Sequence, residues 1–429
     1  MLWKLSHGAR IKGVRSVPLT AHNSLDLKLT MDPSLNTAEM RLHVAFAKVS
    51  LSPAETEAAE AIARQITDWD AFIETAERNF SLPNIRMHLS RMDPDCLPKR
   101  VHETLNDAAN ASAFRNMMLI SAQRKFAEKC LDPLDMDAVF FKGISLVGQY
   151  YPDLGLRPCR DIDVLVRPES LRPIVLRAIE QGYQFVVPGQ ADRPLVQPSE
   201  IDAALEYRKD ASLLTPEGMA IDLQIKLDKY SGIFADEDVF RQAVPVTLGG
   251  KEFLTLPPVF LFNYICHHHA RHVWSRLHWL SDLDAMITSP ELDVDEAVAL
   301  ADRLNQRGTV EASLEMQRLM SPCADWDPAP DTWRGLKFLE LSLRNLSGDL
   351  DLEKRIGFTM KGGEFMFDWQ ASSGLIRRAR WRQWRKIMQP TIRQYTRFPL
   401  PRGLRWLYVF PRLIHLIART RDRTNKEAD

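Results

Sequence analysis

The sequence predicts an α+β fold, in which a small mixed β-sheet core is flanked by N-terminal and C-terminal helical regions. Helical apolar spacing changes near residue 138 to short apolar runs separated by turns, and it returns after residue 257. The 429 residues are enough for roughly two to three domains. A hydrophobic fraction of 45% and a charged fraction of 26% exclude wholesale disorder, a collagen-like repeat and a polytopic membrane protein.

Five regions are expected along the chain. Residues 1–50 are expected to form a weakly ordered N-terminal segment, because prolines and polar residues interrupt the apolar pattern. Ser52-Pro-Ala-Glu55 then has the form of a capping box with proline at the first helical position. The other regions are a helical subdomain, the mixed core, a helical domain and a basic, aromatic C-terminal region, at residues 51–130, 131–255, 256–350 and 351–429.

Short apolar runs predict the strands of the core. They lie at residues 138–141, 162–166, 183–187, 211–215 and 219–227. Lys142-Gly143 follows the first run and predicts a turn into a helix, and Pro216-Glu-Gly218 predicts a hairpin between the last two. From Pro257 onward the spacing is helical, with two helices expected over 259–287 and more over 310–345.

Asp161 and Asp163 are the most informative residues of the core. Residues i and i+2 of a strand share a face, so these two carboxylates project together. Two rises of roughly 3.3 Å put them about 6–7 Å apart, where they repel unless a cation intervenes. An Asp-x-Asp pair is common on solvated turns, but this one lies inside an apolar run, where unpartnered acids are costly to bury. Mg²⁺ or Mn²⁺ is the expected neutraliser, and a second ion would complete a two-metal site for nucleotidyl transfer.

A third carboxylate is expected from a neighbouring strand, and Asp222 meets that expectation. It alternates with Ile221 and Leu223, as a half-buried strand requires. We predict that Asp222 is a ligand for the catalytic metal or the base for the incoming nucleophile.

The turn before these acids is predicted to bind the nucleotide. Gly143 allows close approach of a phosphate to the backbone, and the helix after it offers free N–H groups. Lys142 would add a cation beside the triphosphate. Arg157 and Arg160 lie beside the acidic pair. Arg157 is expected to pair with a nearby acid. Arg160 is expected either to pair with an acid or to contact the triphosphate.

Several motifs occur in a fixed order: Phe141-Lys-Gly143, Tyr150-Tyr-Pro152, Leu156-Arg-Pro158, Asp161-Ile-Asp-Val-Leu-Val166, Asp222-Leu-Gln224 and His269-Ala-Arg-His272-Val-Trp274, with Trp279 and Asp282 after them. In this order they resemble the bacterial uncharacterised nucleotidyltransferase family of the DNA polymerase β-like superfamily. The sequence departs from the pattern at Gln224, where the family has histidine, and at Ile144, where the superfamily has Gly or Ser. Ser145 comes one position later and joins the nucleotide-binding set implied by the resemblance.

We therefore predict a metal-dependent nucleotidyltransferase that moves a nucleoside monophosphate from an NTP to an unidentified acceptor through the Asp161, Asp163 and Asp222 triad. Catalysis would rest on positioning and charge neutralisation. One open alternative is a different acceptor class, a protein side chain or a tRNA end instead of a small molecule. The other is a catalytically degenerate fold that serves as a binding or scaffold protein in a biosynthetic pathway, which Ile144 and Gln224 keep open.

Four histidines, His267, His268, His269 and His272, have spacings that suit a metal site on one helix face. No HExxH motif and no cysteine at ligand spacing accompany them, so packing or hydrogen bonding is the preferred interpretation. An intermediate hypothesis places His272 and Asp282 in the cleft, in contact with substrate.

The cysteines indicate a reducing compartment. Five are present, none in a CxxC pair, so we expect reduced thiols and a cytoplasmic protein. The first 17 residues contain no apolar region of the signal-peptide type, and no run of eighteen apolar residues predicts a membrane span.

The C-terminal region is strongly basic. Residues 371–429 hold 15 Lys and Arg against 3 Asp and Glu, although the whole chain has no net charge. Arg and Trp are interleaved in 377–386, a mixture that suits an anionic membrane surface or nucleic acid. A helical cap packed on the acidic body is one expectation. The other is membrane contact through residues 377–419, at the inner membrane face, which we favour over RNA or DNA.

Overall fold

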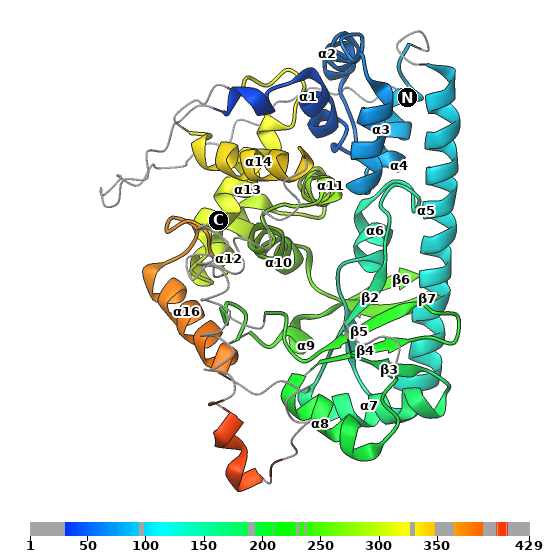
Figure 1. Cartoon of the computed structure of the whole chain (residues 1–429), viewed down its shortest axis with the longest axis vertical. Helices are drawn as coiled ribbons and strands as arrows, with labels where there is room; N and C mark the ends of the chain where they lie inside the picture. The colour runs from blue at the N-terminus through cyan, green and yellow to red at the C-terminus, as the bar shows by residue number, and fades with distance from the viewer. Residues whose placement is uncertain are drawn as a thin grey trace, which may run out of the picture.

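The computed structural model describes residues 31–93, 98–187, 194–208, 210–228, 231–235, 237–326, 331–347, 364–388, 400, 402–408 and 410. It confirms the α+β class, since helices surround a seven-stranded mixed sheet (Figure 1). None of the helices in these ranges combines the length and the apolar character needed to cross a membrane.

Helices form both ends of the described chain. The N-terminal part contains η1 (Pro33–Leu35), α1 (Ala38–Ala45), α2 (Pro53–Ala63), α3 (Trp69–Arg78), α4 (Leu82–Leu89), α5 (Lys99–Phe126), η3 (Ala127–Leu131) and η4 (Asp132–Leu134). The central part contains α6 (Ile144–Tyr150), α7 (Pro168–Glu180), α8 (Pro198–Arg208) and α9 (Val239–Gln242). The C-terminal part contains α10 (Pro258–Arg271), α11 (Leu277–Ile287), α12 (Val294–Arg303), α13 (Arg307–Leu319), α14 (Trp333–Leu346), α16 (Ser373–Met388) and η5 (Arg402–Tyr408).

Local sequence signals account for several helix starts. The predicted capping box is present, since Ser52 Oγ accepts from the Glu55 amide at 3.3 Å and Glu55 accepts from the Ser52 amide at 3.0 Å. The two helices expected over 259–287 are α10 and α11.

The structure differs from the weak order expected for residues 1–50. Residues 1–30 lie outside the described residues, but α1 forms within the remainder, with Thr37 as its N-cap. Its last four residues are all buried. Burial against the other N-terminal helices, rather than a strong local pattern, orders this segment.

The strands are β1 (Ala138–Phe140), β2 (Asp161–Val166), β3 (Gln184–Val186), β4 (Asp210–Leu214), β5 (Ala220–Gln224), β6 (Val244–Leu248) and β7 (Lys251–Thr255), in the order β3-β4-β5-β2-β1-β7-β6. The predicted hairpin is confirmed as the antiparallel pair β4 and β5. The central strand β2 runs antiparallel to β1 and parallel to β5.

Sequence analysis missed the β6–β7 hairpin. Gly249 and Gly250 connect its strands, with φ of 59° and 77°. Two consecutive glycines with positive φ are the signal of a two-residue hairpin turn, so this hairpin was visible in the sequence.

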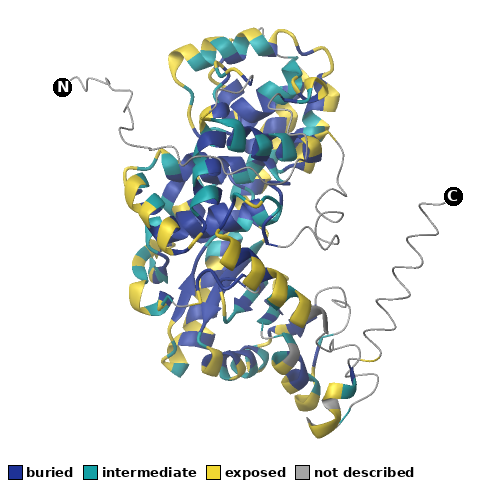
Figure 2. Cartoon of the chain, turned by 90° about the vertical axis from the view of Figure 1, so that its left-hand side faces the viewer, coloured by how far each residue is buried: buried dark blue, intermediate teal, exposed yellow. Residues whose placement is uncertain are grey.

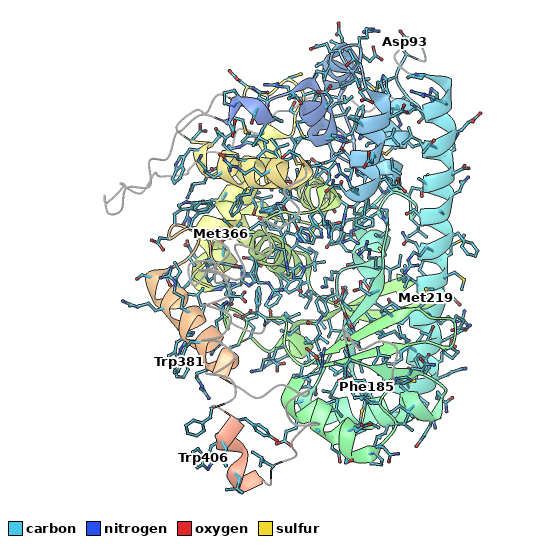
Figure 3. The ribbon with its side chains drawn as sticks, in the orientation of Figure 1. Asp93, Phe185, Met219, Met366, Trp381 and Trp406 are labelled. Carbon is cyan, nitrogen blue, oxygen red and sulfur yellow. The ribbon has the colours of Figure 1, made fainter. Side chains whose placement is uncertain are left out.

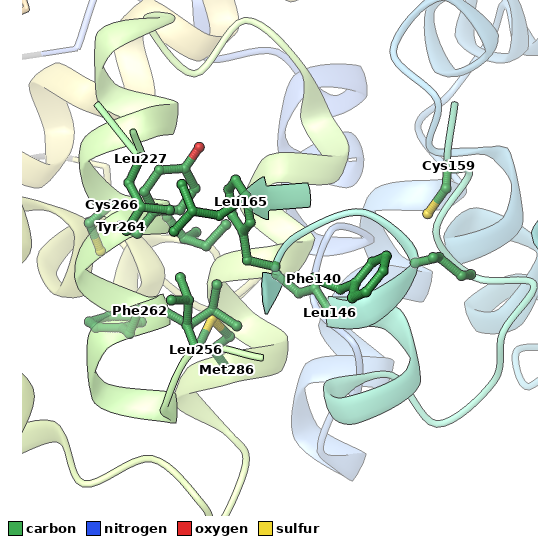
Figure 4. Close-up of a cluster of buried hydrophobic side chains, with 14 of the residues drawn as sticks. Phe140, Leu146, Cys159, Leu165, Leu227, Leu256, Phe262, Tyr264, Cys266 and Met286 are labelled. Atoms are coloured by element: carbon green, nitrogen blue, oxygen red, sulfur yellow. The ribbon is translucent and has the colours of Figure 1, made fainter. Parts of the chain in front are cut away.

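The sheet and the C-terminal helices share one hydrophobic core. Buried residues of the strands and of α10 to α14 belong to a single cluster, and a second cluster lies among α1 to α5. Figure 4 shows Phe140 and Leu165 of the strands together with Phe262 and Tyr264 of α10. Helix α5 runs beside the sheet from the N-terminal helices (Figure 1), and the strands are largely buried (Figure 2).

Candidate active site

Three predicted acids lie on one face of the sheet. Strands β2 and β5 are parallel neighbours, and Asp163 is in register with Asp222. Directly paired residues of adjacent strands share a face, and Asp161 shares it because it lies two residues before Asp163. Asp163 is buried, with 4% of its surface exposed, whereas Asp161 and Asp222 are half-buried. Segments about sixty residues apart in the sequence thus place three carboxylates on one face of the sheet, although their oxygen atoms do not all lie within 4.8 Å of one another.

Burial and neighbouring charges shift the pKa values of Asp163 and Asp222. Burial raises the pKa of Asp163 to about 7, Lys142 opposes the rise, and the charges of Asp161 and Asp222 add to it. Burial also raises the pKa of Asp222, against a hydrogen bond from Ser212, and Asp161 contributes again. The electrostatic environment therefore favours a further positive charge on this face.

Lys142 supplies the nearest cation. Its Nζ lies 3.0 Å from Oδ1 of Asp163. Burial by itself lowers the pKa of Lys142, but Asp163, Tyr264 and Asp161 outweigh that effect, so the pKa is raised. The lysine therefore stays charged and neutralises one of the acids.

A tight turn between β1 and α6 places this lysine. Lys142 and Gly143 both have positive φ, 32° and 55°. A Cβ on Gly143 would lie 3.2 Å from the backbone oxygen of Asp161, so the glycine lets the turn lie directly against β2. Gln224, which stands in place of the family histidine, donates from Nε2 to Asp163 Oδ1 at 3.0 Å.

The other predicted nucleotide-binding residues, Ser145 and Arg160, lie in α6 and immediately before β2. The side chain of Ser145 is buried in the first turn of α6. Arg160 is exposed, and its Cζ lies 4.0 Å from the ring centroid of Phe80. Arg276 approaches the same ring, with its Cζ at 5.8 Å. Arg276 was not among the residues predicted from the sequence, although it lies only two residues after the His269–Trp274 motif.

Arg157 pairs with a nearby acid, Asp282, as the sequence predicted. Its Nε donates to Asp282 Oδ1 at 2.5 Å and its terminal nitrogen to Oδ2 at 2.8 Å. Tyr151 donates to the same Oδ1 at 2.7 Å. Asp282 has no exposed surface. The hypothesis that Asp282 faces a cleft and touches substrate is therefore wrong. This acid is buried, and its hydrogen bonds with Arg157 and Tyr151 connect helix α11 to the segment between α6 and β2.

The histidine run divides among different roles. His269 stacks on Trp279 at 4.8 Å between ring centroids and lies 3.3 Å from Asp282. His268 and His272 contact each other at 4.9 Å between centroids. The histidine pairs whose spacing suits a metal site are not among the close donor groups of the described residues, and their ring contacts agree with the preferred packing interpretation. Within the described ranges, the one trio with donor atoms all within 4.8 Å is Asp228, His267 and Glu364.

The structure is thus an α+β protein with three acids and a lysine on one face of its mixed sheet. The chain belongs to the uncharacterised nucleotidyltransferase family, whose model matches residues 65–321, more than half of its length. This match extends beyond both ends of the resemblance noted in the sequence.

Two further comparisons add little. An antigenic nucleotidyltransferase-like protein from Paracoccidioides brasiliensis is similar in structure, with 14% identity over 49% of this chain and 93% of that chain. The TM-score is 0.26, which is too low to carry an argument. Comparison with curated proteins gives no match.

Proposed function

We propose that this protein is a metal-dependent nucleotidyltransferase of the DNA polymerase β-like superfamily. The observation that carries the proposal is the register of Asp163 with Asp222, which gathers three acids on one sheet face beside Lys142. Asp161, Asp163 and Asp222 offer the oxygen donors that Mg²⁺ or Mn²⁺ prefers. Burial raises the pKa of Asp163 and the charges of Asp161 and Asp222 raise it further, so a bound cation would stabilise the ionised carboxylates. The donor types therefore suit such an ion, and binding one would draw together oxygens that do not all lie within 4.8 Å of one another in this structure.

The proposed reaction transfers a nucleoside monophosphate. An acceptor oxygen bonds to the α-phosphorus of an NTP, the bond from that phosphorus to the β-phosphate bridge oxygen breaks, and pyrophosphate leaves. The acceptor proton passes to Asp222 or to water. Lys142 and Arg160 would offset phosphate charge, Gly143 would admit a phosphate close to the backbone, and the buried Ser145 would support the turn. A bound divalent ion supplies charge neutralisation at the phosphates.

Labelling tests this proposal. The protein is incubated with α-³²P-labelled NTPs, Mg²⁺ or Mn²⁺ and a cell lysate. We expect label on a protein, an RNA or a small molecule, and the labelled fraction names the acceptor class. Asp163→Asn should abolish labelling. Asp202→Asn, on the exposed surface of α8, is the matched control and should leave labelling unchanged. Equal labelling by wild type and Asp163→Asn contradicts the assigned site.

A second candidate function is a degenerate binding or scaffold protein. The specific observation in its favour is that Asp163 already has two partners in the protein, the ion pair with Lys142 and the hydrogen bond from Gln224, which occupies the position of the family histidine. Absence of labelling with every NTP, together with retained NTP binding, supports this alternative.

We further propose that α16 contacts an anionic membrane surface as a peripheral element at the inner membrane face. Its inner face is buried through Leu375, Ile376 and Ala379. Trp381 and Trp384 lie on another face and are 55% and 57% exposed (Figure 3 labels Trp381 and Trp406). Arg385 lies over the Trp381 ring at 4.7 Å. Exposed indoles among arginines are typical of helices that lie in a membrane interface. Residues 389–399, 401, 409 and 411–419 of the predicted contact segment lie outside the described residues.

Vesicle co-sedimentation tests the membrane proposal. The full chain should bind vesicles that contain phosphatidylglycerol and not vesicles of phosphatidylcholine alone. Trp381→Ala/Trp384→Ala should weaken binding, whereas Phe114→Ala, which removes an equally exposed ring on α5, should not. Binding of labelled RNA with no vesicle binding favours the nucleic-acid alternative instead.

A further inference from the structure

A buried trio of ligating side chains lies outside the proposed active site. Asp228 follows β5, His267 is on α10, and Glu364 is in the segment that leads into α16. Their exposed fractions are 7%, 3% and 5%. The nearest donor atoms all lie within 4.8 Å of one another, although the residues come from three distant parts of the sequence.

Neighbouring groups orient both carboxylates toward the imidazole. Asp228 accepts from the amide and the hydroxyl of Ser231 and from the amide of Gly232. Its Oδ1 lies 3.8 Å from His267 Nε2. Glu364 Oε1 lies 3.7 Å from Arg271, and its Oε2 lies 3.0 Å from the same Nε2. Outer hydrogen bonds of this kind orient the ligands of metal sites in proteins.

Two of the donor atoms that face one another in the trio make no well-aligned hydrogen bond. His267 Nε2 and Glu364 Oε2 are both fully buried, and neither makes a well-aligned hydrogen bond despite their 3.0 Å separation. Burying such atoms without a hydrogen-bond partner is unfavourable. A cation bonded to both atoms would satisfy both at once.

We propose that Asp228, His267 and Glu364 bind a transition-metal dication, of which Zn²⁺ is the best match. One imidazole nitrogen with two carboxylate oxygens is a borderline donor set that Zn²⁺ accepts, whereas Mg²⁺ prefers oxygen donors alone. Three protein ligands leave the fourth tetrahedral position for water.

The ion would fasten the C-terminal segment to the body of the protein. Glu364 lies nine residues before α16. Asp228 accepts a hydrogen bond from the amide of Gly232 and so orders the loop that contains this glycine. A Cβ on Gly232 would collide with Arg382 of α16, so this helix lies directly against that loop. Metal bound by the trio would therefore stabilise the attachment of the segment before α16 at Glu364 and the contact of α16 with the Gly232 loop.

Zinc binding by the full chain tests the proposal. The protein is stripped with EDTA and titrated with Zn²⁺ in competition with a chromogenic chelator, without nucleotide. We expect one tight equivalent for wild type and for His268→Gln, the matched control on the same helix. Glu364→Gln and His267→Gln should weaken binding by roughly 10- to 100-fold or more. Far-UV circular dichroism checks that the variants remain folded.

Two further readouts keep the outcome decisive. Co²⁺ should give a visible absorption band of tetrahedral type with wild type and not with Glu364→Gln. Asp163→Asn should keep the zinc equivalent, which separates this site from the proposed active site. The proposal is overturned if wild type binds no Zn²⁺ tightly, or if Glu364→Gln binds Zn²⁺ with the same affinity as wild type. The trio would then be held by a proton on His267 shared with the two carboxylates.

Discussion

Replacing Arg157 with methionine should destabilise the protein strongly. The change keeps an apolar chain of similar length but removes two charge-assisted hydrogen bonds to Asp282, at 2.5 and 2.8 Å. Tyr151 and His269 remain beside the carboxylate. At about 1.5–3 kcal/mol for each lost bond, the free energy of unfolding should fall by roughly 3–5 kcal/mol, the usual result of leaving a buried charge unpaired.

Urea unfolding followed by tryptophan fluorescence measures this loss. Arg157→Met/Asp282→Leu should recover at least half of the lost stability, because no charge is then left buried. Arg172→Met, which breaks an exposed pair with Asp202, is the control and should leave the midpoint unchanged. A loss below about 1 kcal/mol in Arg157→Met, or a double variant no more stable than the single one, would refute the reasoning.

Three other predictions follow from burial and backbone geometry. Gly143→Ala should lose about 1–3 kcal/mol of stability in thermal unfolding, because its φ of 55° is strained for alanine and the new Cβ would press on β2. Burial lowers the pKa of His43 to about 3 and that of His88 to about 4, so each stays neutral while the unfolded chain takes up a proton. Their contribution to stability should therefore be complete above pH 6.5 and fall below it by about 1.4 kcal/mol per pH unit for each histidine, whereas unchanged stability at pH 5 would contradict this. Burial raises the pKa of Cys130 to about 11 and that of Cys266 to about 12, so alkylation at pH 8 followed by mass spectrometry should label them only after unfolding.

Local patterns were enough to predict much of the fold. The capping box at Ser52 and the alternation of Asp161 and Asp163 with apolar residues are encoded within a few residues, and the structure has the corresponding elements. The hairpin at Gly249 and Gly250 was equally local but was overlooked. Helix α1 was not predictable in this way, because it is ordered by burial against distant helices.

The sequence by itself determined which side chains share a face of each strand, and so which acids belong together on β2. The tertiary structure decided the register that sets Asp163 beside Asp222, the ion pair with Lys142, and the burial of Asp282. It also decided which histidine meets two carboxylates. The periodicity of one segment fixes the direction of its own side chains, but the partner of each side chain depends on packing between segments that are distant in sequence.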